Sequence, residues 1–431
     1  MSDSRYAGDE ALRRCLASGE TPLATTFVLK IAERCNLNCS YCYMYNKGDT
    51  SYLRRPKFMA KEMATAALER IASYAARHKL PKITLALHGG EPLLIGQKWV
   101  QWFLEECGRA QENTGIELIV GVQTNGTFLD AEWLELLNAH RVTIGISSDG
   151  PEEWNDLLRI GFDGRGSYRR VRAAIELLAA TPGTRWGVLT VVNPSAKGSA
   201  VLQHLADLGV QRIDFIWPDF NHDHPPPWPK GTLARYFCEL FDYWYDEMRS
   251  PPRIRFFESA MSLMLGGASE CDALGLHPVA DIIVESDGTW EPLDTLRICG
   301  DGITRTGLDV RRHEVEAIWE SPLYQMGLHC QELMSAQCQA CACRRICGGG
   351  YLPHRYRRAT GIANPSVYCA DLLELLTHIG QRIVTDLRQA GILKDALQRT
   401  PMTPCYDRPT RMGTISERSP TGPRPRKQPA L

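Results

Sequence analysis

Three thiols fall close together in the stretch Cys35-Asn36-Leu37-Asn38-Cys39-Ser40-Tyr41-Cys42, soon after the apolar, strand-like run 26–31. A [4Fe–4S] cluster in a closed electron-transfer site takes four cysteines. Three cysteines therefore leave one iron open to a different ligand. A structural zinc site would need a fourth ligand nearby, and residues 43–47 supply none. The alternative is an incomplete zinc knuckle or three unrelated buried thiols, but the spacing favours an iron–sulfur cluster with an open iron.

The composition is that of an ordinary globular protein. Of the 431 residues, 44% are hydrophobic and 23% are charged, and the formal net charge is -1. This charge gives no electrostatic case for binding nucleic acid or an anionic membrane surface. No apolar run approaches the ~20 residues of a membrane helix, and residues 1–20 lack the apolar core of a secretory signal. We expect a cytoplasmic protein of two or three domains whose 15 cysteines are ligands or catalysts rather than disulfides.

Strand-like and helix-like runs alternate from residue 25 onward. The expected strands are nearly continuous in apolar character, as strands buried on both faces are. They cover Phe27–Ile31, Ile83–Leu87, Ile116–Val122, Val142–Ser147, Trp186–Val192 and Arg212–Ile216. Amphipathic helices are expected between them, including Ala60–His78 and a helix after Ser167, which we place as its N-cap. Six strand–helix units predict a parallel α/β barrel or part of one, short of the eight units of a closed barrel.

The pattern changes after the barrel. A helix is expected over Leu233–Met248, and the region from Gly266 to Cys369 is rich in Cys, Gly and short runs. In that region we expect a hairpin, from Val279–Glu285 through a turn at Asp287-Gly288 to Trp290. A last helix is expected over Asp371–Gln389. The predicted division is a lead-in (1–24) with a short helix (10–17), a partial barrel (25–235), a bridging helical segment (236–265), a Cys-rich domain (266–375), a C-terminal helix (376–399) and a disordered tail (400–431).

Polar motifs follow three of the expected strands. His88-Gly89-Gly90-Glu91-Pro92 follows the second strand, where glycines let the backbone approach a ligand closely. Gln123-Thr124-Asn125-Gly126 follows the third strand, and Ser147-Ser148-Asp149-Gly150 follows the fourth. Because ligands bind at the carboxyl ends of parallel strands, we expect these groups at one site, with polar side chains suited to ribose hydroxyls. Asn-Gly and Asp-Gly also form turns, and one residue can serve both purposes.

A second group of cysteines lies in the C-terminal third of the chain. Seven thiols fall between Cys299 and Cys369, with Cys271 just before them. The group contains Cys338-x2-Cys341-x5-Cys347, and Cys-x2-Cys is a strong metal chelate because both sulfurs can turn onto one ion. The clustering predicts two metal-binding regions, with zinc as the alternative to iron–sulfur at the second.

Together these motifs resemble the radical S-adenosylmethionine (SAM) enzymes. The three-cysteine stretch, with an aromatic residue before its last cysteine, looks like the cluster signature of that family. The resemblance implies a partial (β/α)6 barrel in which the open iron binds SAM and an electron from the cluster cleaves SAM to a 5′-deoxyadenosyl radical. It also implies that Glu91 and glycine carbonyls hold the SAM ammonium and that Arg159 holds the carboxylate, although Arg159 could instead be a surface residue. The expected SAM-binding residues are Tyr41, Gly89, Gly90, Glu91, Gln123, Asn125, Ser147 and Arg159.

The Cys-rich region resembles the SPASM domain of peptide-modifying radical SAM enzymes. Four cysteines hold an auxiliary [4Fe–4S] cluster there, and the matching residues here are Cys338, Cys341, Cys347 and Cys369. Two ligands of a second auxiliary cluster are absent, because Leu293 and Tyr351 stand at their positions. The remaining thiols either rebuild that cluster in another way or stay free, and we favour free thiols; they are Cys271, Cys299, Cys330 and Cys343.

Asp294 directly follows the first of these two positions. In the resembling sulfatase-maturing enzymes, an Asp at this place takes a proton from the substrate. A carboxylate in a partly dry site could act as a base here too. A structural ion pair is an equally good alternative.

Short stretches indicate the subfamily. Cys42-Tyr43-Met44-Tyr45-Asn46 and residues 291–297 are similar to those of the cyclophane-forming peptide maturases of the FxsB type. This resemblance implies a ribosomal precursor peptide as substrate, a carbon–carbon crosslink from an aromatic ring to a β-carbon as product, and an external electron donor such as flavodoxin or ferredoxin. The alternatives are a sulfatase-maturing enzyme that forms formylglycine, against which the two absent ligands count, and a thioether-forming maturase. A non-catalytic iron–sulfur carrier or zinc scaffold is disfavoured, because it has no use for an open iron.

Overall fold

One sheet is the centre of the described chain. The computed structural model describes residues 22–392, and their strands are hydrogen-bonded in the order β7-β6-β5-β4-β3-β2-β1-β8-β9. All neighbouring pairs are parallel except β8 and β9. The strands are β1 (Thr26–Ala32), β2 (Lys82–Gly89), β3 (Glu117–Thr124), β4 (Thr143–Ser147), β5 (Trp186–Val191), β6 (Arg212–Ile216), β7 (Arg253–Ile254), β8 (Ile282–Val284) and β9 (Trp290–Glu291). The predicted partial barrel is confirmed, with β1 to β6 at the expected places.

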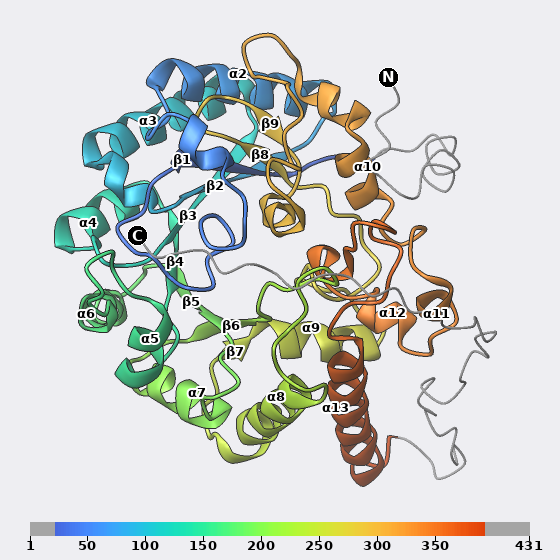
Figure 1. Cartoon of the computed structure of the whole chain (residues 1–431). Helices are drawn as coiled ribbons and strands as arrows, with labels where there is room; N and C mark the ends of the chain where they lie inside the picture. The colour runs from blue at the N-terminus through green and yellow to red at the C-terminus, as the bar shows by residue number, and fades with distance from the viewer. Residues whose placement is uncertain (1–21, 393–431) are drawn as a thin grey trace, which may run out of the picture. The chain divides into compact units, whose positions relative to one another are not determined.

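Within residues 22–392, the helices from α2 to α9 connect the strands and lie outside the curved sheet, and those from α10 to α13 follow β9 (Figure 1). They are α2 (Lys61–Arg77), α3 (Gln97–Thr114), α4 (Ala131–Ala139), α5 (Glu152–Leu158), α6 (Tyr168–Ala179), α7 (Gly198–Asp207), α8 (Thr232–Asp242), α9 (Arg255–Met264), α10 (Pro322–Leu328), α11 (Ala336–Gln339), α12 (Arg344–Cys347) and α13 (Cys369–Gln389). Short 3₁₀ turns cover Ser51–Arg54, Pro92–Ile95, Asp294–Cys299, Val315–Glu320 and Leu352–Arg355, and a π-helical turn covers Tyr243–Glu247. No helix within 22–392 has the length and apolar character needed to cross a membrane.

Apolar side chains between the sheet and the helices form the main core. On β1, Phe27 and Leu29 are fully buried, and on α2 Ile71 and Tyr74 recur at helical spacing and are fully buried as well. The rings of Phe27 and Tyr74 meet edge to face with centroids 5.9 Å apart. Burying one such side chain contributes roughly 1.5–3 kcal/mol. The apolar runs thus form strands and helices because each buries its stripe against the next layer.

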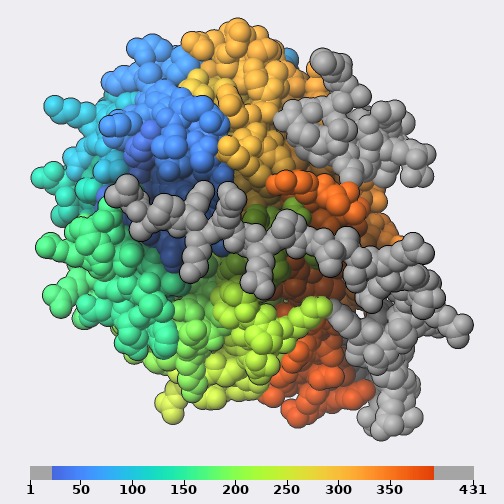
Figure 2. Space-filling model, viewed as in Figure 1, coloured from blue at the N-terminus to red at the C-terminus, as the bar shows by residue number. Residues whose placement is uncertain are grey.

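The Cys-rich region is joined to the barrel through the sheet. Strand β8 pairs with β1 in parallel, so that Phe27 lies opposite Ile282. The predicted hairpin exists, but its strands are shorter than expected and the first extends the barrel sheet. In Figure 2 the atoms near residue 50 (blue) and near residue 300 (orange) form one continuous surface. The predicted domain boundary at 265/266 therefore does not coincide with a break in packing.

Two further boundaries fall inside helices. The expected limit at 235/236 lies within α8, and the limit at 375/376 lies within α13, which packs against α8 and α9. Ser167 precedes α6, as predicted, but its hydroxyl donates to the carbonyl oxygen of Arg159 (2.8 Å) and does not cap the helix. The helix over 10–17 and the tail over 400–431 lie outside the described residues.

A second, smaller core lies in the Cys-rich region. It contains Leu293, Leu296, Ile298, Cys299, Leu323, Met326, Cys330, Leu333, Leu352, Tyr356 and Ile362, with Tyr43 and Tyr351 packed against it. Leu293, at a predicted position of an absent ligand, is thus an apolar core residue.

Candidate active site

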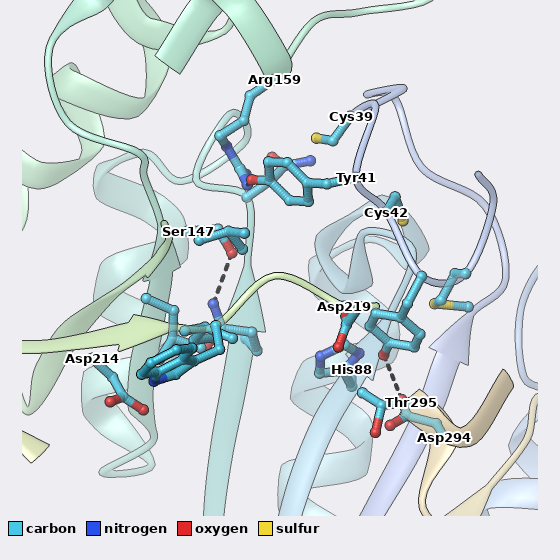
Figure 3. A pocket seen from close by; sticks show the side chains of 18 of the residues that line it. Cys39, Tyr41, Cys42, His88, Ser147, Arg159, Asp214, Asp219, Asp294 and Thr295 are labelled. Atoms are coloured by element: carbon cyan, nitrogen blue, oxygen red, sulfur yellow. Dashed lines mark hydrogen bonds between the residues drawn. The ribbon is translucent and has the colours of Figure 1, made fainter. Parts of the chain in front are cut away.

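The carboxyl ends of the strands surround a cavity of about 430 Å3. Its lining includes the three thiols of the loop after β1 and nearly all of the expected SAM-binding residues. Those that line it are Cys35, Cys39, Cys42, Tyr41, Gly89, Gly90, Gln123, Asn125, Ser147 and Arg159. Figure 3 shows Cys39, Tyr41 and Arg159 near one another, while His88, Asp294 and Thr295 lie together on another part of the wall.

Backbone hydrogen bonds hold the cysteine loop against the segment after α5. The N–H of Asn38 donates to the carbonyl oxygen of Ile160 (2.7 Å), and the N–H of Ser40 donates to that of Leu158 (3.0 Å). Burial raises the pKa of Cys35 to about 12 and that of Cys42 to about 11. Thiolates are the form that binds metal, so such buried thiols need a cation beside them to ionise.

The three thiols lie near one another, which fits a shared cluster. Cys39 and Cys42 lie close enough to Cys35 that, beyond the effect of burial, they add to the rise of its pKa, and the Asn125 amide nitrogen lies 3.6 Å from the Cys35 sulfur. Within residues 22–392, no three Cys, His, Asp or Glu side chains already stand in metal-binding geometry. The loop therefore supplies neighbouring thiols, and the cluster itself would fix their final orientation.

Glycine is required where β2 ends. Gly89 has a φ of +152°, and a Cβ there would lie 2.0 Å from the carbonyl oxygen of Ala32. At Gly90 a Cβ would lie 1.9 Å from the Tyr45 hydroxyl and 2.5 Å from the carbonyl oxygen of Arg34. The two glycines thus let the backbone after β2 pass directly against the start of the cysteine loop.

Glu91 differs from the prediction, because its carboxylate is not part of the cavity lining. It is fully buried and accepts hydrogen bonds from the Thr124 hydroxyl (2.6 Å), the Asn125 N–H (2.7 Å) and the Leu93 N–H (3.0 Å). Burial raises its pKa, and these hydrogen bonds oppose the shift. Glu91 therefore ties the turn after β2 to the end of β3 and places Asn125 toward the cavity.

Arg159, Tyr41 and Asp149 form a hydrogen-bonded row. Arg159 donates to the Tyr41 hydroxyl (2.7 Å), which donates to Asp149 (2.8 Å). Arg159 is buried, so it is not the surface residue of the alternative interpretation, and its Nε has no hydrogen-bond partner. The Arg159 side chain lines the cavity, and a guanidinium there fits a ligand carboxylate.

Gln123 and Ser147 lie side by side on β3 and β4. The Gln123 amide donates to the Ser147 hydroxyl (2.9 Å), as Figure 3 shows. The amide lies over Gly145, where a Cβ would be only 2.0 Å from its oxygen. The two polar groups therefore face the cavity together, and their contact with a ribose stays a prediction.

Asp294 lies in a cluster with Lys30, Tyr43 and His88, to none of which the sequence alone assigned a role. Its carboxylate forms an ion pair with Lys30 and accepts a hydrogen bond from the Tyr43 hydroxyl. Lys30 also lies 3.0 Å from Nδ1 of His88. Burial alone would raise the pKa of Asp294, but the charge of Lys30 holds it well below its usual range, while burial and Lys30 lower the pKa of His88 to about 3. The signal in the sequence was a lysine inside an otherwise apolar strand.

A buried charge network lies behind this group. Arg297 is paired with Glu285 and lies 3.6 Å from Glu291 and 3.8 Å from Asp49. Arg55 is paired with the same two glutamates. All five side chains are buried, so the network fixes the 3₁₀ turn Asp294–Cys299 against the barrel.

The four cysteines predicted to hold the auxiliary cluster lie close enough to influence one another electrostatically, and their role as its ligands stays a prediction. The charges of Cys369, Cys338 and Cys341 act on Cys347, whose pKa burial raises to about 12. The Ser335 hydroxyl caps α11 by accepting from the Cys338 N–H (3.2 Å). These four thiols fit one shared metal centre.

The thiols outside the two predicted sets of cluster ligands are spread out. Cys271 borders the cavity, while Cys299 and Cys330 belong to the second core. At the second absent ligand position, the Tyr351 hydroxyl makes a 2.6 Å hydrogen bond with Thr295. An aromatic side chain and an apolar core therefore occupy the place where the resembling enzymes have ligands.

Comparison with known proteins gives a consistent result. A model of the radical SAM superfamily matches residues 29–194. The cysteine-type anaerobic sulfatase-maturating enzyme of Clostridium perfringens is 23% identical over 84% of this chain and 98% of its own length. The serine-type enzyme of Bacteroides thetaiotaomicron is 24% identical over 80% of this chain and 86% of its own. An uncharacterized protein of Archaeoglobus fulgidus is 32% identical over 81% of this chain and 79% of its own.

Solved structures share the fold. The enzyme anSMEcpe with bound AdoMet superposes with a TM-score of 0.74 at 21% identity, covering 87% of this chain and 97% of that one. SuiB of Streptococcus suis, bound to the precursor peptide SuiA, gives a TM-score of 0.55 at 14% identity, over 83% of this chain and 79% of that one.

These relatives correct the predicted product. The prediction of a carbon–carbon cyclophane crosslink is wrong, because the named enzymes that match most of the chain are sulfatase-maturating enzymes of both types. The stated alternative, a formylglycine-forming enzyme, agrees with them better. The absent ligands at Leu293 and Tyr351 misled the prediction, since they were counted against that alternative.

Proposed function

Because the chain belongs to the radical SAM superfamily, we propose that it oxidises the β-carbon of a cysteine or serine in a peptide substrate to formylglycine. As a radical SAM enzyme it uses a [4Fe–4S] cluster and SAM, and at least one auxiliary [4Fe–4S] cluster. The relatives that support the proposal are named for acting on sulfatases through a cysteine or a serine. A related structure holds a peptide together with AdoMet.

One observation carries the proposal: a single cavity brings the cysteine loop and the Asp294 carboxylate together. A site that only moved electrons would not need a charged carboxylate in the same cavity as the cysteine loop. Oxidation of an alcohol or thiol carbon does need one, because the S–H or O–H proton must leave as the carbon is oxidised.

The cofactors supply a 5′-deoxyadenosyl radical that removes a hydrogen atom from a β-carbon. The residues of this chain do the rest. Arg159 and the backbone at Gly89 and Gly90 orient SAM, and Cys35 with its two neighbours holds the cluster. Asp294 accepts the substrate proton.

Lys30 sets the strength of Asp294 as a base. The positive charge of Lys30 keeps the Asp294 carboxylate ionised, so that it can accept a proton. The same charge lowers the proton affinity of that carboxylate. Tyr43 donates to the same carboxylate, so its hydroxyl can keep a hydrogen bond as the proton arrives. The electron leaves toward the four-cysteine site, and we expect a flavodoxin or ferredoxin as external redox partner.

The test uses reconstituted, full-length protein under anaerobic conditions with SAM and dithionite. Two synthetic sulfatase active-site peptides, identical except for cysteine or serine at the target, serve as substrates. We expect an aldehyde on at least one peptide, detected by hydrazide labelling and mass spectrometry. SAM cleavage without any aldehyde on either peptide would refute the proposal.

Asp294→Asn separates SAM cleavage from oxidation of the peptide substrate. It keeps the shape of the side chain but cannot take a proton, so we expect 5′-deoxyadenosine to form while the aldehyde yield falls by about 10²-fold or more. Asp163→Asn, at an exposed loop position, is the matched control and keeps the wild-type yield.

A further inference from the structure

Four aromatic side chains lie between the cavity and the four-cysteine site. Trp217 and Tyr351 line the cavity, and His354 and Tyr368 lie behind them. Trp217, His354 and Tyr368 are each at most 5% exposed. We call these four residues the aromatic bridge.

The rings of the bridge touch in sequence. Trp217 and Tyr368 have centroids 5.2 Å apart. Tyr351 and His354 are 5.2 Å apart, and His354 and Tyr368 are 5.1 Å apart. Phe237 stacks on the other side of Trp217 at 4.5 Å. Two rows of rings, one from each cavity residue, therefore meet at Tyr368.

Tyr368 is the neighbour of a cluster ligand. Its peptide bond leads directly to Cys369, one of the four predicted ligands, and its hydroxyl is anchored on the carbonyl oxygen of Pro218 (2.8 Å). At the other end Tyr351 follows Cys347 after three glycines, and the Gly350 N–H donates back to the Cys347 carbonyl oxygen (2.9 Å). Both rows thus begin at the cavity and end beside the four thiols.

Tyr351 stands where the resembling enzymes place a ligand of their extra cluster. Leu293 and Tyr351 replace two expected ligands of that cluster, so the bridge offers an electron leaving the cavity a path that does not need it. The same place holds the packed rings of Tyr351, His354 and Tyr368. Electron tunnelling falls off less steeply through packed, bonded atoms than through gaps, so the bridge offers the better coupled path.

We propose that the aromatic bridge carries the electron from the oxidised substrate to the four-cysteine site. This rests on the proposed function. In the step, the substrate β-carbon has already lost a hydrogen atom to the deoxyadenosyl carbon. It then loses one electron through the bridge to the oxidised auxiliary [4Fe–4S] cluster and one S–H or O–H proton to Asp294, and a C=S or C=O bond forms. With a cysteine substrate, water then hydrolyses the C=S bond to the aldehyde and hydrogen sulfide leaves. An oxidised flavodoxin-class protein then removes the electron from the auxiliary cluster.

The decisive variant is Tyr368→Leu, because both rows pass through this ring. Tyr368→Phe is its conservative partner, since it keeps the ring and loses only the hydroxyl. In a single turnover we expect Tyr368→Leu to make 5′-deoxyadenosine at the wild-type rate, while aldehyde formed per 5′-deoxyadenosine falls by about tenfold or more. Tyr368→Phe should restore most of the coupling, and wild-type coupling in Tyr368→Leu would overturn the proposal.

Tyr324→Leu is the matched control. Tyr324 is also a buried tyrosine that donates to a backbone carbonyl oxygen, that of Ala280 (3.0 Å), but it is not part of the bridge. The Tyr324→Leu variant should form as much aldehyde per 5′-deoxyadenosine as the wild type does. If Tyr368→Leu loses iron, the double variant Trp217→Leu/His354→Leu, which interrupts both rows, carries the same test.

A second readout does not depend on peptide oxidation. Freeze-quench EPR follows how one electron, added by a short pulse of reductant without peptide, redistributes between the two clusters. We expect Tyr368→Leu to slow this redistribution by about tenfold or more, with dithionite still reducing both clusters fully. If the wild type makes no aldehyde, the proposed function fails, and the redistribution rate still decides whether the bridge conducts. Equal rates in Tyr368→Leu and wild type would refute the bridge.

Discussion

At the scale of single residues, the chemistry depends on Lys30. A lysine in the middle of β1 is fully buried, which is costly unless the charge is paired. The pairing is with Asp294, while Tyr43 and His88 take its remaining hydrogen bonds. Lys30 thus fixes the carboxylate in place and keeps it ionised.

Lys30→Met should expose this dependence. Without its partner, the buried Asp294 carboxylate loses the cause of its lowered pKa, and burial then raises that pKa. A lowered pKa keeps its contribution to stability at neutral pH and loses it only as pH falls through the folded value. In the variant Asp294 is protonated at higher pH, so the acid limb of aldehyde formation shifts upward. The unpaired carboxylate should cost roughly 3–5 kcal/mol of stability at neutral pH, and part of this loss is regained as pH falls through the raised pKa.

The measurements are pH–rate profiles of aldehyde formation and urea unfolding. Lys82→Met is the control, because Lys82 also lies in a strand but is exposed. An unchanged acid limb in Lys30→Met would show that Lys30 does not tune Asp294.

The sequence predicted the thiols of the site but not the charged and polar side chains that surround Asp294. Cysteine spacing indicates a ligand set because few other functions need that pattern. Lys30 gave only a weak signal, since a charged residue within an apolar strand does not reveal its partner. Glu91 was assigned to SAM from its motif, but its hydrogen bonds to the end of β3 depend on how two distant turns pack.

At the scale of elements, the backbone at the end of β2 makes an unusually close contact with the chain after β1. The chain passes so close to Ala32 and Arg34 that side chains cannot fit at Gly89 or Gly90. Packing against the end of β2 therefore fixes the position of the cysteine loop as much as its covalent link to β1 does.

Gly89→Ala should displace the loop. The added methyl would overlap the Ala32 carbonyl oxygen at a φ that L residues rarely adopt, so we expect a loss of about 1–3 kcal/mol of stability and slower SAM cleavage. Denaturant unfolding and 5′-deoxyadenosine formation measure the two effects.

Gly108→Ala provides the comparison for this substitution. Gly108 lies in α3, and a methyl group added there would meet open space, so alanine should be neutral or stabilise by up to about 1 kcal/mol. Equal behaviour of the two variants would contradict the steric argument.

The long elements were predictable and the short ones were not. Strands β1 to β6 follow from apolar runs, because each must be buried on both faces. Strand β7 has only two residues, too few for any pattern, and it exists because β6 offers it an edge. The hairpin β8–β9 was visible from its Asp-Gly turn, but its pairing with β1 is a tertiary contact that no local pattern records.

At the scale of the whole described chain, buried charges connect the barrel to the Cys-rich region. Arg55 comes from the segment after β1, whereas Arg297 and the two glutamates come from residues 285–297. Such a network is costly to break, because removing one partner leaves the others buried and unpaired.

Arg297→Met should therefore destabilise the protein by roughly 3–5 kcal/mol. Arg312→Met removes an arginine that is 70% exposed and paired with Asp309, and it should cost at most about 1 kcal/mol. Denaturant titrations of both variants compare the two, and a similar cost for each would mean that the network adds little.

Strand β1 has a neighbour on each side, β2 from the barrel and β8 from the Cys-rich region. A fragment that stops before residue 282 would leave one side of β1 with unpaired N–H and C=O groups, a template on which strands of other molecules can add. The two regions are therefore not interchangeable modules. The barrel depends on the Cys-rich region to keep this strand edge covered, so recombination between family members should succeed only when β1 and β8 are inherited together.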